Sequence, residues 1–364
     1  MNLNTVNINK ILIIRLSSIG DIILTTPLVR SLREKFDDAV IDYVVKEEYL
    51  DLVRTNHHLN DVIPFNKSGG FTELIKLKRY IRSQKYDLVI DLHKNFRSVY
   101  LRSFLSGAKI TKYKKNYFNR SLLVWFGINR FEKIIPVYRK YFYAVKDLGL
   151  DYDESGTEVH IPEKEEKKVK NALNRSGYDW KRPLIIICPG AGFATKRWKK
   201  EGYTEAAETL AREYDAFIGL LGGSGDKELC ESIRTGMKKR AVNFAGSLSL
   251  LESAALLRES SLVITNDTGM LHLAQSQVRP VVAVYGPTTI ELGYFPFMEN
   301  SFVIQYDIAC RPCTHNGSEK CPRKHFKCMN EIRTEEVIKA SEQLIESEKI
   351  SSGKNDDGNL VSSV

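Results

Sequence analysis

The residues of this chain that are best suited to chemistry follow two apolar segments in its second half. The segment Asn266–Gly269 comes directly after an apolar strand expected at 262–265 and precedes a helix. A second apolar strand, expected at 280–285, ends in Gly286–Thr289. Ligands of an open α/β sheet bind beyond the carboxyl ends of its strands, and the free N–H groups of a helix start bind phosphate. The pattern therefore indicates a nucleotide-diphosphate site, although ordinary helix caps and a turn glycine would leave the same residues.

A carboxylate stands at the first strand-to-helix turn of the chain. The opening strand, expected at 10–16, runs into the turn Arg15–Asp21, and a helix is expected from there to about Phe36. Asp21 would lie in the first turn of that helix, where the helix dipole keeps a carboxylate ionised. A helix-start acid with no special role would look the same.

Two further turns of the second half resemble phosphate-binding or ribose-binding loops. In Pro189–Trp198, Gly190 lets the backbone approach a phosphate and Lys196 can neutralise it. The glycines of Leu221–Asp226 lack the full Gly-x-Gly-x-x-Gly spacing, but Asp226 could accept hydrogen bonds from ribose hydroxyls. Taken singly, both turns are weak indications, because flexible surface lysines and turn glycines are common.

The elements that must position these turns alternate between strand and helix. Strands are expected at 10–16, 39–45, 61–65, 86–91, 184–188, 216–221, 262–265 and 281–285. Helices are expected between them, among others at 71–83, 137–148 and 334–346. Strands separated by helices of this length form right-handed βαβ units and a parallel sheet. The fold class is therefore α/β with two doubly wound domains.

The domain organisation follows from length and local composition. A chain of 364 residues is too long for one ordinary core. The alternation stops in an acidic and charge-dense stretch at 151–182, in which 163–170 is expected to be a solvated helix. We expect an N-terminal domain at 1–165, a C-terminal domain at 180–348 and a disordered tail at 351–364, which is rich in Ser, Gly, Asn and Asp.

A basic and aromatic segment lies at 109–140. The chain has a net charge of +9, and this segment holds nine Lys or Arg residues against one acid, Glu132. Basic residues interleaved with aromatic ones suit an acidic membrane surface, single-stranded nucleic acid, or simply a solvated face over an aromatic core. Without a nucleic-acid motif, we favour a membrane surface or an acidic substrate and expect no nucleic-acid partner.

The sequence favours a cytosolic protein. It holds no apolar run of the roughly 18 residues that span a bilayer, and its first ten residues lack the layout of a secretory signal. In that compartment, a cluster of cysteines resembles a metal site more than a set of disulfides. Their spacing matches the common zinc patterns poorly, so structural zinc, reduced thiols and adventitious disulfides all stay open. The cluster consists of Cys310, Cys313, Cys321 and Cys328.

Several segments in the same order resemble the ADP-heptose:lipopolysaccharide heptosyltransferases. The matching segments are Ile13–Leu28, Pro189–Ala191 with Lys196–Trp198, Thr265–His272, Tyr285–Thr288, and the cysteine cluster followed by Met329–Ile332. The resemblance implies an inverting GT-B glycosyltransferase with its site in the cleft between two facing domains. It implies transfer of heptose from ADP-heptose to the Kdo/heptose inner core of lipopolysaccharide, with no metal or cofactor required for the reaction.

The resemblance also implies roles for individual residues. Asp21 matches the general base, and Lys196 matches a lysine that contacts the donor diphosphate. The matching donor-binding turn comprises Asp267, Thr268, Gly269 and His272, although His272 could face the cleft or pack under the turn. Gly190 and, with poorer local similarity, Asp226 would complete the donor site.

The acceptor implied by the resemblance is an anionic glycolipid, so the enzyme would associate peripherally with the cytoplasmic face of the inner membrane. Residues expected to contact the acceptor or the membrane are Arg15, Ser18, Lys112, Lys114, Lys115 and Arg120. The alternatives are a related transferase with another nucleotide sugar or a later core acceptor, a nucleotide-sugar epimerase, and a non-catalytic nucleotide-binding module.

Overall fold

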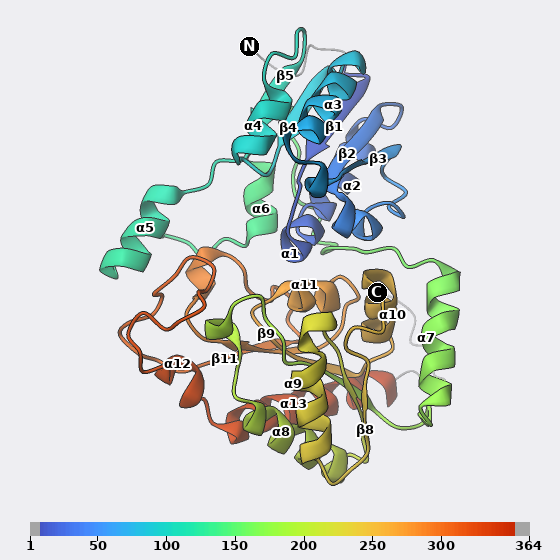
Figure 1. The fold of residues 1–364 in the computed structure, drawn as a ribbon, viewed down its shortest axis with the longest axis vertical. Helices are drawn as coiled ribbons and strands as arrows, with labels where there is room; N and C mark the ends of the chain where they lie inside the picture. The colour runs from blue at the N-terminus through green and yellow to red at the C-terminus, as the bar shows by residue number, and fades with distance from the viewer. Residues whose placement is uncertain (1–7, 354–364) are drawn as a thin grey trace, which may run out of the picture.

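The computed structural model describes the backbone of residues 8–353 and the side chains of residues 8–347. The chain forms two α/β lobes, one above the other in Figure 1, and each is built on a parallel sheet. No helix in the described part of the chain is both long and apolar enough to cross a membrane. The predicted fold class is confirmed.

The N-terminal sheet has five parallel strands in the order β3-β2-β1-β4-β5. Its strands are β1 (Lys10–Ile14), β2 (Val40–Lys46), β3 (Asp61–Phe65), β4 (Leu88–Asp91) and β5 (Lys109–Lys112). The first four match predicted strands, whereas β5 was not predicted. Strand order reverses between β1 and β4, which is where ligands bind in such sheets.

The helices of this lobe are α1 (Ile19–Ile23), α2 (Thr26–Lys35), α3 (Gly70–Ser83), α4 (Phe96–Arg102), α5 (Tyr117–Phe126) and α6 (Val137–Phe142). The prediction of one helix up to Phe36 is wrong, because α1 and α2 are separate. Pro27 has no N–H for the carbonyl of Ile23, and the hydroxyl of Thr26 donates to that carbonyl instead at 2.8 Å. The helix expected at 137–148 likewise ends at Phe142, and a short 3₁₀ turn covers Lys146–Leu148.

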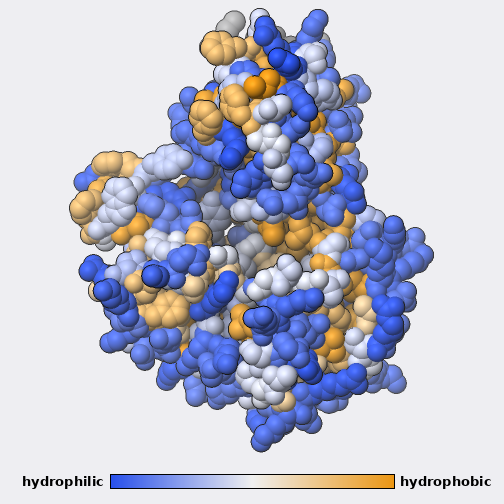
Figure 2. All heavy atoms as spheres, in the orientation of Figure 1, coloured by the Kyte–Doolittle hydropathy of each residue, from blue (hydrophilic) through white to orange (hydrophobic). Residues whose placement is uncertain are grey.

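Helix α5 stands away from the sheet of its own lobe (Figure 1), and hydrophobic residues gather on the surface over it (Figure 2). Trp125 and Phe126 are each 69% exposed, and Phe118 is 66% exposed. The predicted basic and aromatic segment therefore places several of its rings at the surface rather than in a core.

The C-terminal sheet has six parallel strands in the order β11-β10-β9-β6-β7-β8. Its strands are β6 (Leu184–Cys188), β7 (Phe217–Leu220), β8 (Ala241–Asn243), β9 (Leu262–Asn266), β10 (Val281–Tyr285) and β11 (Ser301–Gln305). Its order reverses between β6 and β9, so the turns after these strands meet at one edge. Strands β8 and β11 were not predicted.

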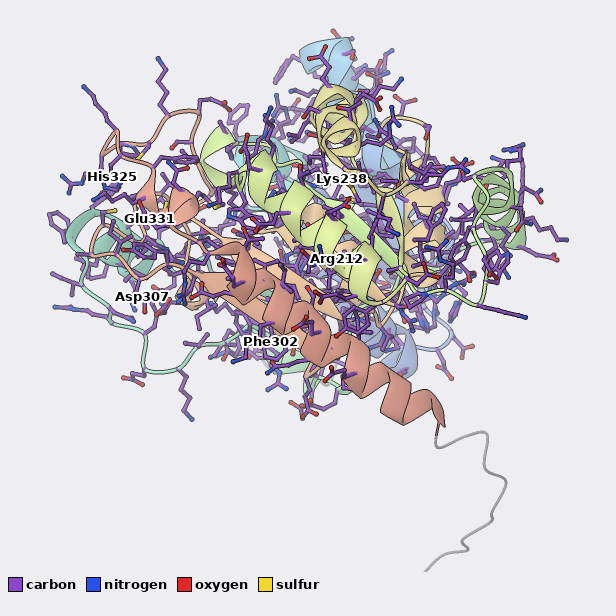
Figure 3. The ribbon with its side chains drawn as sticks, turned by 90° about the horizontal axis from the view of Figure 1, so that it is seen from below. Arg212, Lys238, Phe302, Asp307, His325 and Glu331 are labelled. Carbon is purple, nitrogen blue, oxygen red and sulfur yellow. The ribbon has the colours of Figure 1, made fainter. Side chains whose placement is uncertain are left out.

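Helices pack around this second sheet, and α8 and α13 lie side by side in the view of Figure 3. The helices are α7 (Glu163–Arg175), α8 (Lys200–Glu213), α9 (Lys227–Gly236), α10 (Leu250–Arg258), α11 (Gly269–Gln275), α12 (Lys327–Asn330) and α13 (Thr334–Gly353). The charge-dense helix α7 packs on α10 and buries Val169 and Leu173. Because α13 extends to Gly353, it overlaps the start of the predicted tail, whereas 354–364 lie outside the described residues.

The two lobes meet where α1 faces α11, and two glycines allow the approach. A Cβ atom at Gly20 would lie 2.4 Å from Cδ2 of His272, and one at Gly269 would lie 2.7 Å from Cβ of Ile19. These are distances that real Cβ atoms do not adopt. The apolar core is continuous across this contact, since one buried cluster contains Ile22 of α1 and Leu271 of α11.

We expect Gly269→Ala to force α1 and α11 apart, because its new methyl group would overlap Cβ of Ile19. Overpacking of this kind costs about 1–3 kcal/mol of unfolding free energy. Chemical denaturation measures the loss. The matched control is Gly225→Ala, whose Cβ meets no atom within 4 Å. Equal stability of the two variants would contradict the tight contact.

Candidate functional site

A pocket of about 600 Å³ lies between the lobes and is lined by both of them. From the N-terminal lobe come the turn after β1 and residues near α5; from the C-terminal lobe come the turns after β6, β9 and β10. The predicted residues that line it are Arg15, Ser18, Asp21, Lys115, Arg120, Lys196, Asp267, Thr268, Gly269 and His272. Turns far apart in the sequence thus meet at the strand-order reversal of each sheet.

Asp21 is held mainly through one of its two oxygens. Its Oδ1 lies 2.6 Å from Nη2 of Arg15 and accepts hydrogen bonds from the hydroxyls of Tyr294 at 2.9 Å and Tyr141 at 3.2 Å. Its Oδ2 accepts from Ser18, whose hydroxyl lies at 3.0 Å. Tyr294 belongs to the C-terminal lobe, so this carboxylate is bonded from both lobes. Oδ2 keeps more capacity for a further hydrogen bond.

The surroundings of Asp21 keep it ionised. Burial alone would raise its pKa, but the Arg15 guanidinium and the hydrogen bonds from Tyr294 and Ser18 outweigh burial and lower the pKa to about 2. Because this value lies below the ordinary 3.8, the ionised group stabilises the fold above pH 3.8, and that contribution is lost as the pH falls toward 2.

Arg15 is 3% exposed and lines the pocket, so of the two contacts expected of it, its position suits the acceptor rather than the membrane. Its Nη1 donates to the carbonyl of Leu92 at 2.5 Å and its Nε to that of Ser17 at 2.8 Å. With Nη2 on Asp21, each of the three guanidinium nitrogens has a partner in the wall of the pocket. An isolated buried charge would be costly, and this pairing is what allows both groups to stay charged there.

On the C-terminal side, Asn266 ties two strand ends together. Its amide donates to the carbonyl of Pro189 at 2.8 Å and accepts from the N–H of Trp198 at 3.2 Å. The loop between these two residues carries Lys196, whose Nζ lies 2.6 Å from Oδ2 of Asp267. Nζ also donates to the Asp267 carbonyl at 3.0 Å. Asn266 fixes the loop that carries Lys196, and the two contacts with Asp267 hold the lysine over the turn that follows β9.

The start of α11 faces the same pocket. Thr268 caps this helix by accepting the N–H of Met270 at 3.3 Å. His272, one turn further, is 3% exposed and packs against Gly20 while also lining the pocket. Burial lowers the pKa of His272 to about 4, so its ring is neutral near pH 7. His272 therefore lines the pocket, and its ring packs against α1 of the opposite lobe.

Gly190 and Asp226 lie together but do not line this pocket. A Cβ at Gly190 would come within 2.3 Å of the Asp226 carboxyl group. That carboxylate accepts the N–H of Gly223 at 2.9 Å. The two predicted donor residues thus form one close contact between the turns after β6 and β7, beside the main pocket.

The four basic residues expected at the acceptor or membrane divide into two pairs. Lys115 and Arg120 line the pocket, and burial lowers the pKa of Lys115. Lys112 and Lys114 are exposed outside it. Lys115 and Arg120 are therefore placed to meet an acceptor in the pocket, whereas Lys112 and Lys114 are placed to meet a surface outside it.

The cysteine segment folds against the Lys196 loop. Thr195 and Ser318 exchange two hydrogen bonds, at 2.7 and 2.8 Å, and bring His315 and Asn316 to the pocket wall. Its four cysteines are free thiols, and Cys310 Sγ lies 3.7 Å from Nε2 of His325. Among residues 8–347, no three ligand atoms of the cysteines and histidines of this segment lie within 4.8 Å of one another. Disulfides are thus not formed, and a zinc geometry is not shown.

Sequence reasoning missed the tyrosines around Asp21. Tyr294 lies 273 positions from Asp21 along the chain, and Tyr141 lies 120 positions away. Only the folded arrangement of the two lobes brings their hydroxyls to one oxygen.

The architecture of two facing doubly wound lobes with a polar pocket between them is that of the GT-B glycosyltransferases. The model of glycosyltransferase family 9 (heptosyltransferase) matches residues 74–323, which is more than half of the chain. The chain belongs to this family and is an enzyme of the glycosyltransferase class. The family assignment does not support the epimerase or the non-catalytic alternative.

Individual relatives agree with this assignment over nearly the whole chain. Lipooligosaccharide heptosyltransferase 2 of Campylobacter jejuni is 26% identical and is aligned over 90% of this chain and 95% of its own length. The crystal structure of a family 9 glycosyl transferase from Veillonella parvula is 26% identical, with a TM-score of 0.78 over 94% of this chain and 98% of that one. Escherichia coli ADP-heptose lps heptosyltransferase II, at 24% identity, a TM-score of 0.72 and coverage of 93% and 99%, supports the fold.

We expect Tyr294→Phe to raise the pKa of Asp21, because it removes a hydrogen bond to the ionised carboxylate. If ionised Asp21 is needed for turnover, the acid limb of kcat/KM against pH then moves upward from its position in the wild type. The control is Tyr143→Phe, which alters an exposed tyrosine. An unchanged acid limb in Tyr294→Phe would contradict this account of the carboxylate.

Proposed function

We propose that this enzyme transfers heptose from ADP-heptose to the inner core of lipopolysaccharide, with inversion at the anomeric carbon. The observation that carries the proposal is the pocket in which Asp21 of one lobe faces Lys196 and the α11 start of the other. Relatives are named heptosyltransferases of lipooligosaccharide or lipopolysaccharide, and one solved structure is named for ADP-heptose. The arrangement of charges in the pocket is consistent with such a donor and acceptor.

The chemical step is a single displacement. Oδ2 of Asp21 accepts the proton of the acceptor hydroxyl, and the oxygen of that hydroxyl bonds to C1 of the heptose. The bond between C1 and the diphosphate oxygen breaks, and its electron pair leaves with ADP. A carboxylate with a pKa of about 2 is a weak base, so its contribution comes from position and from the electrophilic character of the sugar carbon.

Negative charge that develops on the departing diphosphate needs fixed positive groups. Lys196 and the backbone N–H groups at Thr268 and Gly269 provide them in this proposal. Lys196 is paired with Asp267, which is itself held by the Thr288 hydroxyl at 2.7 Å. The diphosphate would therefore compete with Asp267 for the lysine, and Asp267 would keep the ammonium in place between turnovers.

We expect Asp21→Asn to lower acceptor-dependent ADP release from ADP-heptose by about 10²–10⁴-fold, the usual contribution of a general base. The assay compares release with and without a heptose-deficient lipopolysaccharide. The control is Asp38→Asn, which changes an exposed carboxylate of the same lobe. Release that is independent of acceptor would indicate hydrolysis, and full activity of Asp21→Asn would exclude its role as base.

The acceptor would enter beside the basic residues of the N-terminal lobe. Lys115 and Arg120 line the pocket next to Asp21 and suit the phosphates or carboxylates of an anionic glycolipid. Ser18 lies at the same rim and contacts Oδ2 of Asp21. These positions favour an acceptor whose negative groups flank the reacting hydroxyl.

Peripheral association with the cytoplasmic face of the inner membrane is a further part of the proposal. Helix α5 exposes Phe118, Trp125 and Phe126, and Lys112 and Lys114 are exposed on the segment that leads into it. Exposed rings beside lysines suit the interface of an anionic bilayer. An acceptor anchored in that bilayer would then reach the pocket from the α5 side.

We expect the double variant Lys112→Glu/Lys114→Glu to bind vesicles containing anionic lipid more weakly, by roughly 1 kcal/mol per lysine removed. Co-sedimentation with such vesicles measures the loss, and neutral vesicles should bind both proteins poorly. The matched control is Lys164→Glu/Lys167→Glu on the exposed face of α7. Equal losses in the two double variants would argue for unspecific charge attraction instead of an α5 membrane face.

Structural zinc in the cysteine segment stays a prediction. Four thiols lie within 19 positions, and Nε2 of His325 lies 3.7 Å from Sγ of Cys310. Metal analysis of the purified enzyme tests it: zinc that is present in the wild type and lost in Cys313→Ser supports a site, and equal zinc in both excludes one there.

A further inference from the structure

Three histidines gather at a place that the transferase reaction does not use. His57 and His58 follow the 3₁₀ turn Glu47–Leu52 of the N-terminal lobe, and His160 belongs to the segment that leads from this lobe to α7. One ring nitrogen from each lies within 4.8 Å of the others. Among residues 8–347 this is the one group of three or more histidine, cysteine or acidic side chains that meets this spacing.

The backbone around the histidines is fixed on both sides. The hydroxyl of Thr55 donates to the carbonyl of His160 at 2.6 Å, and the side-chain carbonyl of Asn56 accepts the N–H of His58 at 2.9 Å. The ring centroids of His57 and His160 are 4.4 Å apart, and those of His57 and His58 are 4.1 Å apart. The group is thus held together by its surroundings, as a binding site requires.

Charge at this place favours a cation. Glu158 Oε1 lies 3.5 Å from Nε2 of both His58 and His160. Arg30 contributes one positive charge, but Asp153 at 2.5 Å and Glu158 at 2.7 Å contribute two negative ones. Within the described residues, Nε2 of His160 is buried and has no hydrogen-bond partner, so this nitrogen is available to a ligand.

We propose that His57, His58 and His160 form a binding site for one late first-row divalent metal ion, such as Zn²⁺. Imidazole is a preferred ligand of these ions, and three histidines leave a coordination position for water. Glu158 would stand beside the ligands and orient their rings, as carboxylates commonly do around metal-bound histidine. His57 is exposed and the other two are half-buried, so an ion can enter from solvent.

A bound ion would fasten the connecting segment to the N-terminal lobe. Hydrogen bonds already attach this segment to the N-terminal lobe. Arg30 donates to the carbonyl of Gly156 at 2.9 Å, and Thr26 Oγ1 accepts the N–H of Glu158 at 2.9 Å. Beyond His160 the chain enters α7, which packs on α10 of the other lobe. The ion would therefore act on the connection between the lobes, at a distance from Asp21, and stabilise the native state.

Titration of the full-length enzyme with Co²⁺ tests the proposal. Imidazole ligands give a visible band without the near-ultraviolet charge-transfer band of thiolates, which separates this site from the cysteine segment. We expect one Co²⁺ per chain with such a spectrum, and at least tenfold weaker binding in His57→Gln and in His160→Gln. His325→Gln, beside the cysteines, is the matched control and should bind as the wild type does at this site.

His57→Gln keeps the test decisive if His160→Gln fails to fold, since His57 is exposed. Zn²⁺ should also raise the thermal midpoint of the wild type by more than that of His57→Gln, because only the wild type keeps all three histidines. Equal Co²⁺ affinity in the wild type and His57→Gln, or a spectrum that shows thiolate ligands alone, would overturn the proposal.

Discussion

The close approach of α1 to α11 is the constraint on which the rest of the structure depends. Gly20 and Gly269 leave no room for side chains between the two helices, and the buried core runs through the contact. Each helix begins at the strand-order reversal of its own sheet. The contact therefore places the carboxylate of one lobe opposite the helix start and lysine of the other, which neither lobe could achieve alone.

Electrostatics then decides what this pocket can do. The half-buried Asp21 stays ionised because Arg15 and three hydroxyl groups stabilise its negative charge. One of these hydroxyl groups, on Tyr294, comes from the opposite lobe. The state of the base is thus coupled to the arrangement of the lobes, since separation would remove the Tyr294 hydrogen bond. On the other side, Lys196 is held by Asp267 until an anion competes for it.

Sequence patterns predicted the sheets well where strands are buried and apolar, as for β1, β6, β9 and β10. They failed for β5, β8 and β11, which are only partly buried and mix polar with apolar residues, so their patterns are weak. The strand-end turns were found because glycine, threonine and charged residues cluster there. The role of Arg15 and the contribution of Tyr294 could not be found, because burial and pairing over 273 positions depend on how the lobes face each other.

The two lobes have separate roles in the proposed reaction: the C-terminal lobe binds the donor, and Asp21 of the N-terminal lobe acts on the acceptor. Calorimetric titration with ADP, beside turnover measurements on the same samples, tests these roles most directly. We expect Lys196→Met to bind ADP at least tenfold more weakly. Asp21→Asn should bind ADP as the wild type does and yet lose acceptor-dependent turnover. Asp21→Asn that loses ADP affinity as Lys196→Met does, or Lys196→Met that binds ADP normally, would contradict them.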